Sequence, residues 1–341
     1  MKNSVYILTL VVLFIMSAQI VRAQYTVDYR QYYQNPQTLN PAYAGIDGNW
    51  SFNLGYGSTS LDQDQKASNY YIGANLTFPK IQKSELDVLM RYCAKPKFSK
   101  RKPGVPRKLY GGGQVRHGFG ATLYKRDFRI TSRQEYALTY AVHVPLSRSL
   151  MVSGGAGMLS VLDRIHFDAL NVRHEMDPIY QDLQEGEDNW NYYAAQVGVA
   201  IHSRRIYLGY AFKSKLRSSG APGDLGAEGD THQMSGGVRF SLSPDIEWLN
   251  SANVGLGLDD AKMAVTSQLQ YKDLIRAGAI YDYQESISGI LGIAIGDYAR
   301  TDFTLAYPLE SQYAQLDSKI LYEVSLSFFA FKAKSRAKYF W

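Results

Sequence analysis

The sequence predicts an all-β fold, a transmembrane antiparallel β-barrel of about fourteen strands with a plug-like N-terminal segment. First, from Asn49 onward, apolar residues alternate with small or polar ones in segments of about ten residues separated by turn residues. Second, the chain begins with the pattern of an export signal. Third, no run of about 18 apolar residues follows that signal, so no ordinary transmembrane helix is expected.

The amino-acid composition excludes several classes of protein. The chain has 341 residues, of which 45% are hydrophobic and 20% charged, with 29 Gly, 27 Tyr and one Cys. So many hydrophobic residues argue against a disordered chain. A single cysteine, Cys93, excludes an intramolecular disulfide and a thiolate zinc cluster.

Residues 1–23 are expected to be a cleaved signal peptide. Lys2 supplies positive charge, residues 5–15 form the apolar stretch, and Ala23 ends a small-residue cleavage site. No cysteine follows this site, so a lipid anchor is not expected. The mature protein should therefore leave the cytoplasm and reach the outer membrane.

Residues 24–48 precede the predicted barrel and contain Asn-Pro-Ala-Tyr-Ala-Gly at positions 40–45. Pro41 restricts its own φ and pushes Asn40 toward an extended conformation. Gly45 can adopt a positive φ, and Tyr43 is a large anchor side chain. Two placements fit these residues: a plug beneath or inside the lumen, or a β-turn before the first strand.

The barrel is expected over residues 49–331, and the stretch after Arg133 illustrates the alternation. One face carries Tyr136, Leu138, Tyr140, Val142 and Val144, and the other carries Glu135, Ala137, Thr139, Ala141 and His143. The second face is mostly small or uncharged here and in residues 192–201, 206–213 and 263–271, which favours a lumen over the charged surface of a soluble sandwich. Strands are predicted to start near 49, 67, 114, 131, 150, 189, 205, 231, 247, 262, 274, 286, 298 and 318.

Connection lengths predict which side of the membrane each loop occupies. The connections at 166–188, 215–230 and 310–317 are long, whereas those near 148, 204, 245, 273 and 297 are short. Outer-membrane barrels have long extracellular loops and short periplasmic turns. The N-terminus is therefore expected in the periplasm.

A basic insertion at 80–112 breaks this rule, because it joins the second and third strands on the periplasmic side. Residues 80–110 hold ten Lys or Arg against two acids, a local charge of +8 in a chain of net charge +6. A strand count wrong by one would place this segment outside the cell. Residues 332–341 form a second basic segment, a periplasmic tail.

Motifs for catalysis are missing. The sequence has no GxSxG, HExxH, CxxC or Walker motif, so an enzyme is not expected, and neither a cofactor nor a metal is predicted. His166 and His174 share an acidic loop, which favours a solvated loop over a cation site. His143 faces the predicted lumen near Glu135 in sequence, and a lumen hydrogen bond is favoured over a hydrolase role.

The basic insertion is not expected to bind nucleic acid, because it has few stacking aromatics and lies outside the cytoplasm. It is either a solvated loop or a docking surface for an acidic periplasmic protein.

The N-terminal motif carries a family resemblance. A signal peptide followed by Gln24, then Leu-Asn-Pro-Ala-Tyr-Ala-Gly at 39–45 and a Gly- and Tyr-rich barrel, closely resembles the PorP/SprF family of type IX secretion system membrane proteins. The resemblance covers essentially the whole mature chain in layout. The basic insertion and the tail depart from the typical pattern, which leaves the subtype open.

This resemblance implies a function. Family members are linked to type IX secretion and, in some relatives, to gliding adhesins, with partners that include a secreted protein bearing a C-terminal sorting domain and periplasmic lipoprotein or ring proteins. The loop with Asp177 and Tyr180 resembles the large outer loop of the family. Thirteen residues are candidates for partner binding: Asn40, Pro41, Tyr43, Gly45, Lys97, Lys100, Arg101, Lys102, Arg107, Lys108, Asp177, Pro178 and Tyr180.

The predicted function is thus an outer-membrane component of type IX secretion that binds a secreted or surface-displayed protein. Two alternatives remain. A structural anchor for the periplasmic ring would use the basic segments as its contact surface. A passive diffusion channel would have an open lumen with rings of charge.

Overall fold

The structure is a computed structural model that describes residues 32–62, 65–78, 115–128, 131–147, 150–166, 189–203, 205–219, 230–257, 261–272, 274–283, 286–296, 298–309 and 320–330. Within these ranges three short 3-10 helices precede fourteen strands. The helices are η1 (Tyr32–Gln34), η2 (Pro36–Thr38) and η3 (Pro41–Tyr43). The strands are β1 (Ser51–Asp62), β2 (Gln65–Phe78), β3 (Arg116–Phe128), β4 (Thr131–Pro145), β5 (Met151–Ile165), β6 (Asn189–His202), β7 (Ile206–Ser219), β8 (Thr231–Ser241), β9 (Ile246–Leu256), β10 (Ala261–Tyr271), β11 (Ile275–Asp282), β12 (Ser286–Ile295), β13 (Ala299–Pro308) and β14 (Ile320–Phe329).

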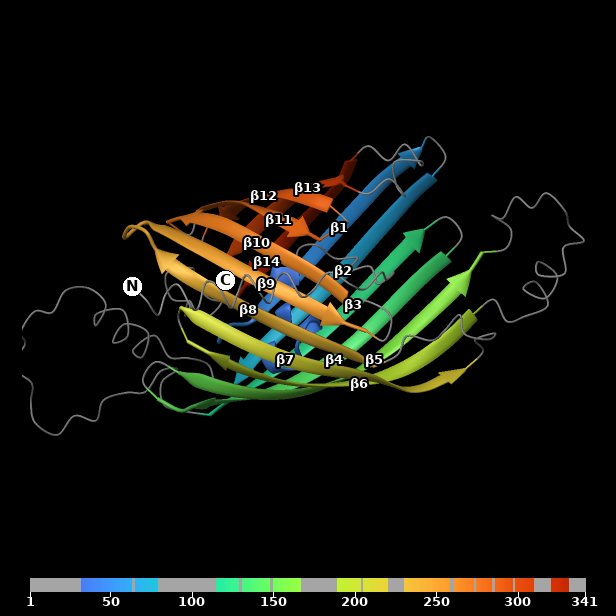
Figure 1. Cartoon of the computed structure of the whole chain (residues 1–341), viewed down its shortest axis with the longest axis horizontal. Coiled ribbons are helices and arrows are strands. Elements are labelled where there is room, and N and C mark those ends of the chain that lie inside the picture. Colours follow the sequence, from blue (N-terminus) through green and yellow to red (C-terminus); the bar gives the residue numbers. More distant parts are fainter. Residues whose placement is uncertain are drawn as a thin grey trace, which may run out of the picture.

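The strands form one closed antiparallel barrel (Figure 1). Each strand pairs with its neighbours in sequence, and β1 pairs with β14, from Ser51 opposite Phe329 to Ser60 opposite Ile320. Closure leaves no open edge in the sheet. A membrane protein needs this, because hydrocarbon cannot hydrogen-bond to the N–H and C=O groups of an unpaired strand. The predicted fold class is confirmed, and every predicted strand start lies within two residues of the observed one.

The two faces of the strands follow the predicted alternation. In β4, Ala137, Thr139, Ala141 and His143 are buried, whereas Leu138 between them is 69% exposed. Large exposed apolar side chains cover the outer face, for example Leu54, Ile72, Leu138, Val199, Leu208, Leu291 and Leu305. None of the helices in the described ranges is long and apolar enough to cross a membrane.

The two ends of the barrel differ in what they join. We call the end at which β1 begins and β14 ends the N-terminal end. Because neighbouring strands are antiparallel, β2 ends and β3 begins at this same end. The basic insertion at 80–112 therefore joins two strands at the N-terminal end, as the strand count predicted, although all of its own residues lie outside the described ranges. The predicted signal peptide at 1–23 and the predicted tail at 332–341 also lie outside them, so both stay predictions.

The interior of the barrel is occupied by residues 33–49, which we call the luminal segment. Its short helices lie within the ring of strands, drawn in blue in Figure 1. Most of its side chains are buried, and Tyr43 and Ile46 are 1% exposed. Of the two placements left open by the sequence, the structure has the segment inside the lumen.

Candidate functional site

The local conformation of the luminal segment follows from Asn40, Pro41 and Gly45. Asn40 is extended, with φ −149° and ψ 118°, and its side-chain Oδ1 accepts a hydrogen bond of 2.9 Å from the backbone N–H of Ala42. Pro41 then begins η3, where its missing N–H is no loss. Gly45 has φ +65°, which favours glycine. The predicted backbone conformations of Asn40 and Gly45 are therefore confirmed.

Asn40 and Tyr43 attach the segment to β6, β7 and β8. The Asn40 Nδ2 group donates to the carbonyl oxygens of Val199 (3.1 Å) and Tyr210 (3.2 Å). The Tyr43 hydroxyl lies 2.7 Å from Ser235 Oγ, and its ring meets the ring of Tyr207 edge-on at 6.1 Å between centroids. Burial raises the pKa of Tyr43, so its hydroxyl stays protonated.

Four inward glycines leave room for this part of the segment. A Cβ on Gly118 of β3 would collide with the Ala44 carbonyl, and one on Gly155 of β5 with the Pro41–Ala42 backbone. A Cβ on Gly198 of β6 would meet the Asn40 side chain, and one on Gly209 of β7 the Tyr43 hydroxyl. We call Gly118, Gly155, Gly198 and Gly209 the glycine socket. It brings the segment into direct contact with strand backbone over four strands.

The far end of the segment is held by β2. Thr77 Oγ1 donates to the Gly45 carbonyl at 2.7 Å, and Asn75 Oδ1 accepts from the Gly45 N–H at 3.3 Å. Asn75 Nδ2 donates in turn to Gln37 Oε1 at 2.8 Å. A Cβ on Gly45 would lie 2.7 Å from Gly118 Cα, so this position needs glycine for space as well as for its φ.

His143 lies under Ala44 in a buried Ser–His cluster. Its Nε2 is 2.8 Å from the Ala44 carbonyl oxygen, which can only accept, so Nε2 carries the proton. Its Nδ1 then accepts from Ser153 Oγ at 2.6 Å, and His202 Nε2 lies 3.1 Å from the same oxygen. All three side chains are fully buried. His143 thus makes the hydrogen bond in the lumen that the sequence predicted.

The beginning of the segment contacts a buried ion pair between strands. Arg276 Nη2 of β11 lies 2.7 Å from Asp302 Oδ1 of β13, with side chains 4% and 0% exposed. Gln34 Nε2 donates to Asp302 Oδ2 at 2.7 Å and also to Ser325 Oγ. The guanidinium carbon of Arg276 is 4.5 Å from the centroid of the Tyr33 ring. Burial raises the pKa of Tyr33, so this hydroxyl also stays neutral.

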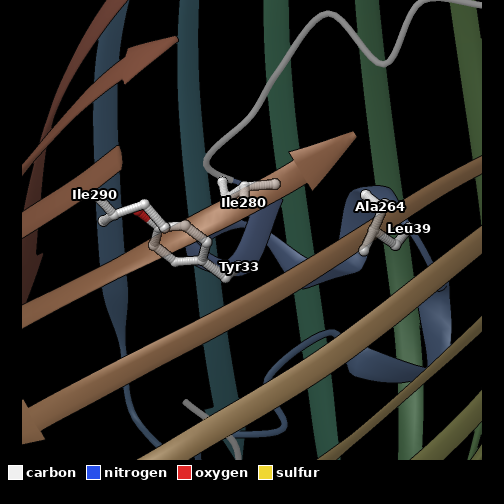
Figure 2. Close-up of a cluster of buried hydrophobic side chains, with 5 residues drawn as sticks. All are labelled: Tyr33, Leu39, Ala264, Ile280 and Ile290. Atoms are coloured by element: carbon white, nitrogen blue, oxygen red, sulfur yellow. The ribbon is translucent and has the colours of Figure 1, made fainter. Parts of the chain in front are cut away.

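An apolar cluster completes this attachment (Figure 2). Tyr33 and Leu39 of the segment lie with Ala264 of β10, Ile280 of β11 and Ile290 of β12, and all five are buried. The close-up shows Tyr33 and Leu39 approaching these strands from the segment inside the barrel. Isoleucines on an inward face otherwise rich in small and polar residues thus mark where the segment packs.

The structure brings together only part of the predicted set of partner-binding residues. Asn40, Pro41, Tyr43 and Gly45 lie together in the lumen and contact the barrel itself. Nine others lie outside the described ranges: Lys97, Lys100, Arg101, Lys102, Arg107, Lys108, Asp177, Pro178 and Tyr180. Within the described ranges, no group of three or more His, Cys, Asp or Glu residues could hold a metal ion.

Sequence reasoning missed Ser153 and the Arg276–Asp302 pair. Ser153 had a usable signal: a hairpin that pairs Pro145 with Met151 places Ser153 opposite His143. Arg276 and Asp302 had none, because β12 separates their strands and neither stands out within its own strand.

The family model for the type IX secretion system membrane protein PorP/SprF matches residues 21–328. No curated protein matches the chain. Among solved structures, the toluene transporter TbuX of Ralstonia pickettii is similar at a TM-score of 0.47 and 10% identity, over 86% of this chain and 92% of that chain. Omp33 of Acinetobacter baumannii is similar at a TM-score of 0.44 and 9% identity, over 83% and 99% of the two chains.

Proposed function

Since this outer-membrane barrel belongs to the PorP/SprF family of type IX secretion system membrane proteins, we propose that it binds a secreted protein bearing a C-terminal sorting domain and supports its export or retention at the cell surface. The role is binding rather than catalysis. The barrel is the rigid support, and the connections at its two ends provide the contact surfaces.

The observation that carries this proposal is the luminal segment. A passive diffusion channel needs a continuous path through the barrel, but residues 33–49 are packed against inward residues of strands on opposite walls, for example Gly155 of β5 and Ile280 of β11. The glycine socket and the Arg276–Asp302 pair are specific to a filled lumen. These contacts support a barrel whose lumen is blocked and which binds its partners through the connections at its two ends.

The orientation expected from the connection lengths supports a different partner at each end of the barrel. With the N-terminal end in the periplasm, the acidic connection that contains Asp177, Pro178 and Tyr180 faces the outside and meets the secreted protein. The basic insertion, with Lys97, Lys100, Arg101, Lys102, Arg107 and Lys108, faces the periplasm. Its +8 charge favours a second function, an anchor for an acidic periplasmic lipoprotein or ring protein.

The test is a cross-linked pull-down of the tagged, full-length protein from intact outer membranes, with bound proteins identified by mass spectrometry. A large secreted protein with a C-terminal sorting domain is expected. Recovery of periplasmic lipoproteins alone would replace the surface role by the anchor role. A variant with the six basic residues at 97, 100, 101, 102, 107 and 108 changed to Gln should lose periplasmic partners and retain the secreted one.

A second measurement addresses the rival channel. The purified full-length protein in a planar lipid bilayer is expected to show no stable open-channel conductance, because its lumen is filled. Stable single-channel conductance together with an empty pull-down would overturn the binding role and establish a diffusion channel.

A further inference from the structure

Asn250 is a polar residue on the apolar outer face of the barrel. It lies on β9 and faces outward with Trp248, whereas Leu249 between them is 3% exposed and faces the lumen. β9 has 11 residues, Ile246–Leu256, about the number that a tilted strand needs to cross the hydrocarbon. Asn250 is the fifth of these residues, so its amide lies near the middle of the membrane among lipid chains.

The side-chain amide of Asn250 makes no hydrogen bond with any residue in the described ranges. Two other polar side chains of the outer face have partners within the barrel. Thr301 Oγ1 donates to the Ser325 carbonyl oxygen at 3.1 Å, and Ser267 Oγ accepts from Trp248 Nε1 at 2.9 Å. Lipid chains neither donate nor accept hydrogen bonds, so an amide at this depth is costly unless another protein group meets it.

Small side chains extend from Asn250 across the next three strands. The pairings place Asn250 of β9 opposite Ser267 of β10, Ser267 opposite Ala279 of β11, and Ala279 opposite Gly289 of β12. All four face outward, and a Cβ added at Gly289 would meet no heavy atom within 4 Å. We call Asn250, Ser267, Ala279 and Gly289 the small-residue row. Small side chains let another protein surface come close to the backbone, as they do where membrane helices meet.

Large exposed side chains border the small-residue row on both sides. Toward the N-terminal end they are Trp248, Leu269 and Leu291, and toward the other end they are Tyr281 and Ile287. A protein surface that rests on the row would contact these side chains as well, and they would separate the Asn250 amide from lipid.

We propose that the small-residue row is a contact surface for a second copy of this chain within the membrane. The amide of Asn250 holds both a donor and an acceptor, so two Asn250 side chains related by a two-fold axis satisfy each other. A different protein would have to supply its own unpaired polar group at the same depth. The row is uncharged, so two copies approach without repulsion. This contact is independent of the proposed secretion partner, which binds at the connections at the ends of the barrel.

The first experiment is cysteine cross-linking of the full-length protein in intact outer membranes, in a Cys93→Ser background that removes the one native cysteine. Ala252→Cys places a thiol on the outer face beside Asn250 and keeps the amide, so a short bis-maleimide is expected to give a covalent dimer. Leu138→Cys is the matched control. Leu138 also faces lipid near the middle of its strand, but it lies on β4, five strands along the barrel from β9, and should stay monomeric.

The second experiment measures the mass of the purified full-length protein in mild detergent by analytical ultracentrifugation. Asn250→Leu is expected to weaken dimerisation about tenfold or more, because its monomer no longer exposes an unpaired amide. Asn250→Gln keeps an amide and should remain a dimer. Leucine suits a lipid-facing position, so Asn250→Leu should still form the barrel, which its circular dichroism spectrum verifies.

Three outcomes would overturn the proposal. They are no cross-linked dimer from Ala252→Cys, equal cross-linking of Leu138→Cys, or an unchanged dimer in Asn250→Leu. Cross-linking of Ala252→Cys to a different membrane protein, identified by mass spectrometry, would assign the small-residue row to that protein and refute the second copy.

Discussion

Two halves of the luminal segment are held in different ways. Residues 40–45 fit against strand backbone, where the glycine socket removes side chains so that Ala44, Pro41 and Ala42 can approach β3 and β5. Residues 33–39 are held by side chains, namely the Arg276–Asp302 pair, the Gln34 hydrogen bonds and the apolar cluster around Tyr33. One half depends on shape and the other on charge and apolar contact.

The two halves should therefore respond differently to substitution. At Gly118 and Gly155 of the glycine socket an added methyl group cannot be accommodated, because the atoms it would meet belong to the main chain of Pro41, Ala42 and Ala44. The side-chain half can reorganise around a smaller apolar residue, but a buried charge that loses its partner cannot be hydrated. Substitutions in each half, and a rise in pH that acts on both, test this difference.

The largest effect is expected for Asp302→Ala. It would leave Arg276 buried without its carboxylate and remove an acceptor of Gln34. Breaking a buried pair in this way typically lowers the free energy of unfolding by about 3–5 kcal/mol. The measurement is denaturant unfolding of the full chain in detergent.

Two further variants test whether the loss of stability comes from burial of an unpaired charge. Asp245→Ala removes one partner of an exposed pair, in which Lys272 Nζ lies 3.5 Å from the carboxylate, and should change stability little. Arg276→Met/Asp302→Leu removes both buried charges and should recover most of the loss. Equal stability of Asp302→Ala and wild type would refute the role assigned to the pair.

The glycine socket is tested by Gly155→Ala. The new Cβ would overlap the Pro41–Ala42 backbone, so we expect a loss of about 1–3 kcal/mol and displacement of residues 40–45 from β5. Displacement should appear as channel conductance in a planar bilayer. Gly154→Ala is the control on the adjacent residue, since its Cβ would meet nothing within 4 Å; identical behaviour of the two variants would contradict the socket.

Alkaline pH should weaken both halves together. Burial raises the pKa of Tyr33 and Tyr43 above the ordinary value of 10.0, so both favour the folded state below pH 10 and withdraw that contribution as pH rises further. Near pH 11 the expected loss is about 1.4 kcal/mol per tyrosine. Unfolding measured from pH 7 to 11 should show it, and Tyr33→Phe/Tyr43→Phe should have a smaller slope above pH 10; an unchanged slope would argue against buried hydroxyls.

The smallest effect is expected for Tyr43→Phe alone at neutral pH. The ring contact with Tyr207 remains, and the hydrogen bonds of the hydroxyl with Ser235 and Asn40 are lost, so stability should fall by about 1 kcal/mol. Tyr210→Phe is the comparison, because its hydroxyl is 2.7 Å from His232 Nδ1 on the exposed outer face. We expect a smaller change there; a larger one would indicate that Tyr43 does not anchor the segment.

The strand pattern was predictable from the sequence because side-chain alternation is a property of each strand by itself. The faces predicted for the stretch that became β4, with Leu138 outward and Ala141 inward, depend only on a two-residue repeat. The backbone conformations of Asn40 and Gly45 were predictable for a similar reason, since proline and glycine act on their own and adjacent residues.

The location of the luminal segment was not predictable in this way. Tyr43 and Ser235 are 192 positions apart, and Gln34 and Asp302 are 268 positions apart. No local pattern relates such pairs, so a plug and a β-turn before β1 remained equally compatible with residues 40–45. The alternation predicted that Gly198 faces the lumen, but no local pattern indicated that it would lie against Asn40.

Local sequence therefore determined export, strand positions, the two faces of the barrel and the turn at Asn40–Pro41. Closure of the barrel decided the rest: it brought β3, β5, β6 and β7 around one short segment and placed Arg276 beside Asp302. The difference lies in how far along the chain each effect acts. Alternation, proline restriction and positive φ act over one or two residues, whereas packing and ion pairing depend on which distant strands the closed sheet brings together.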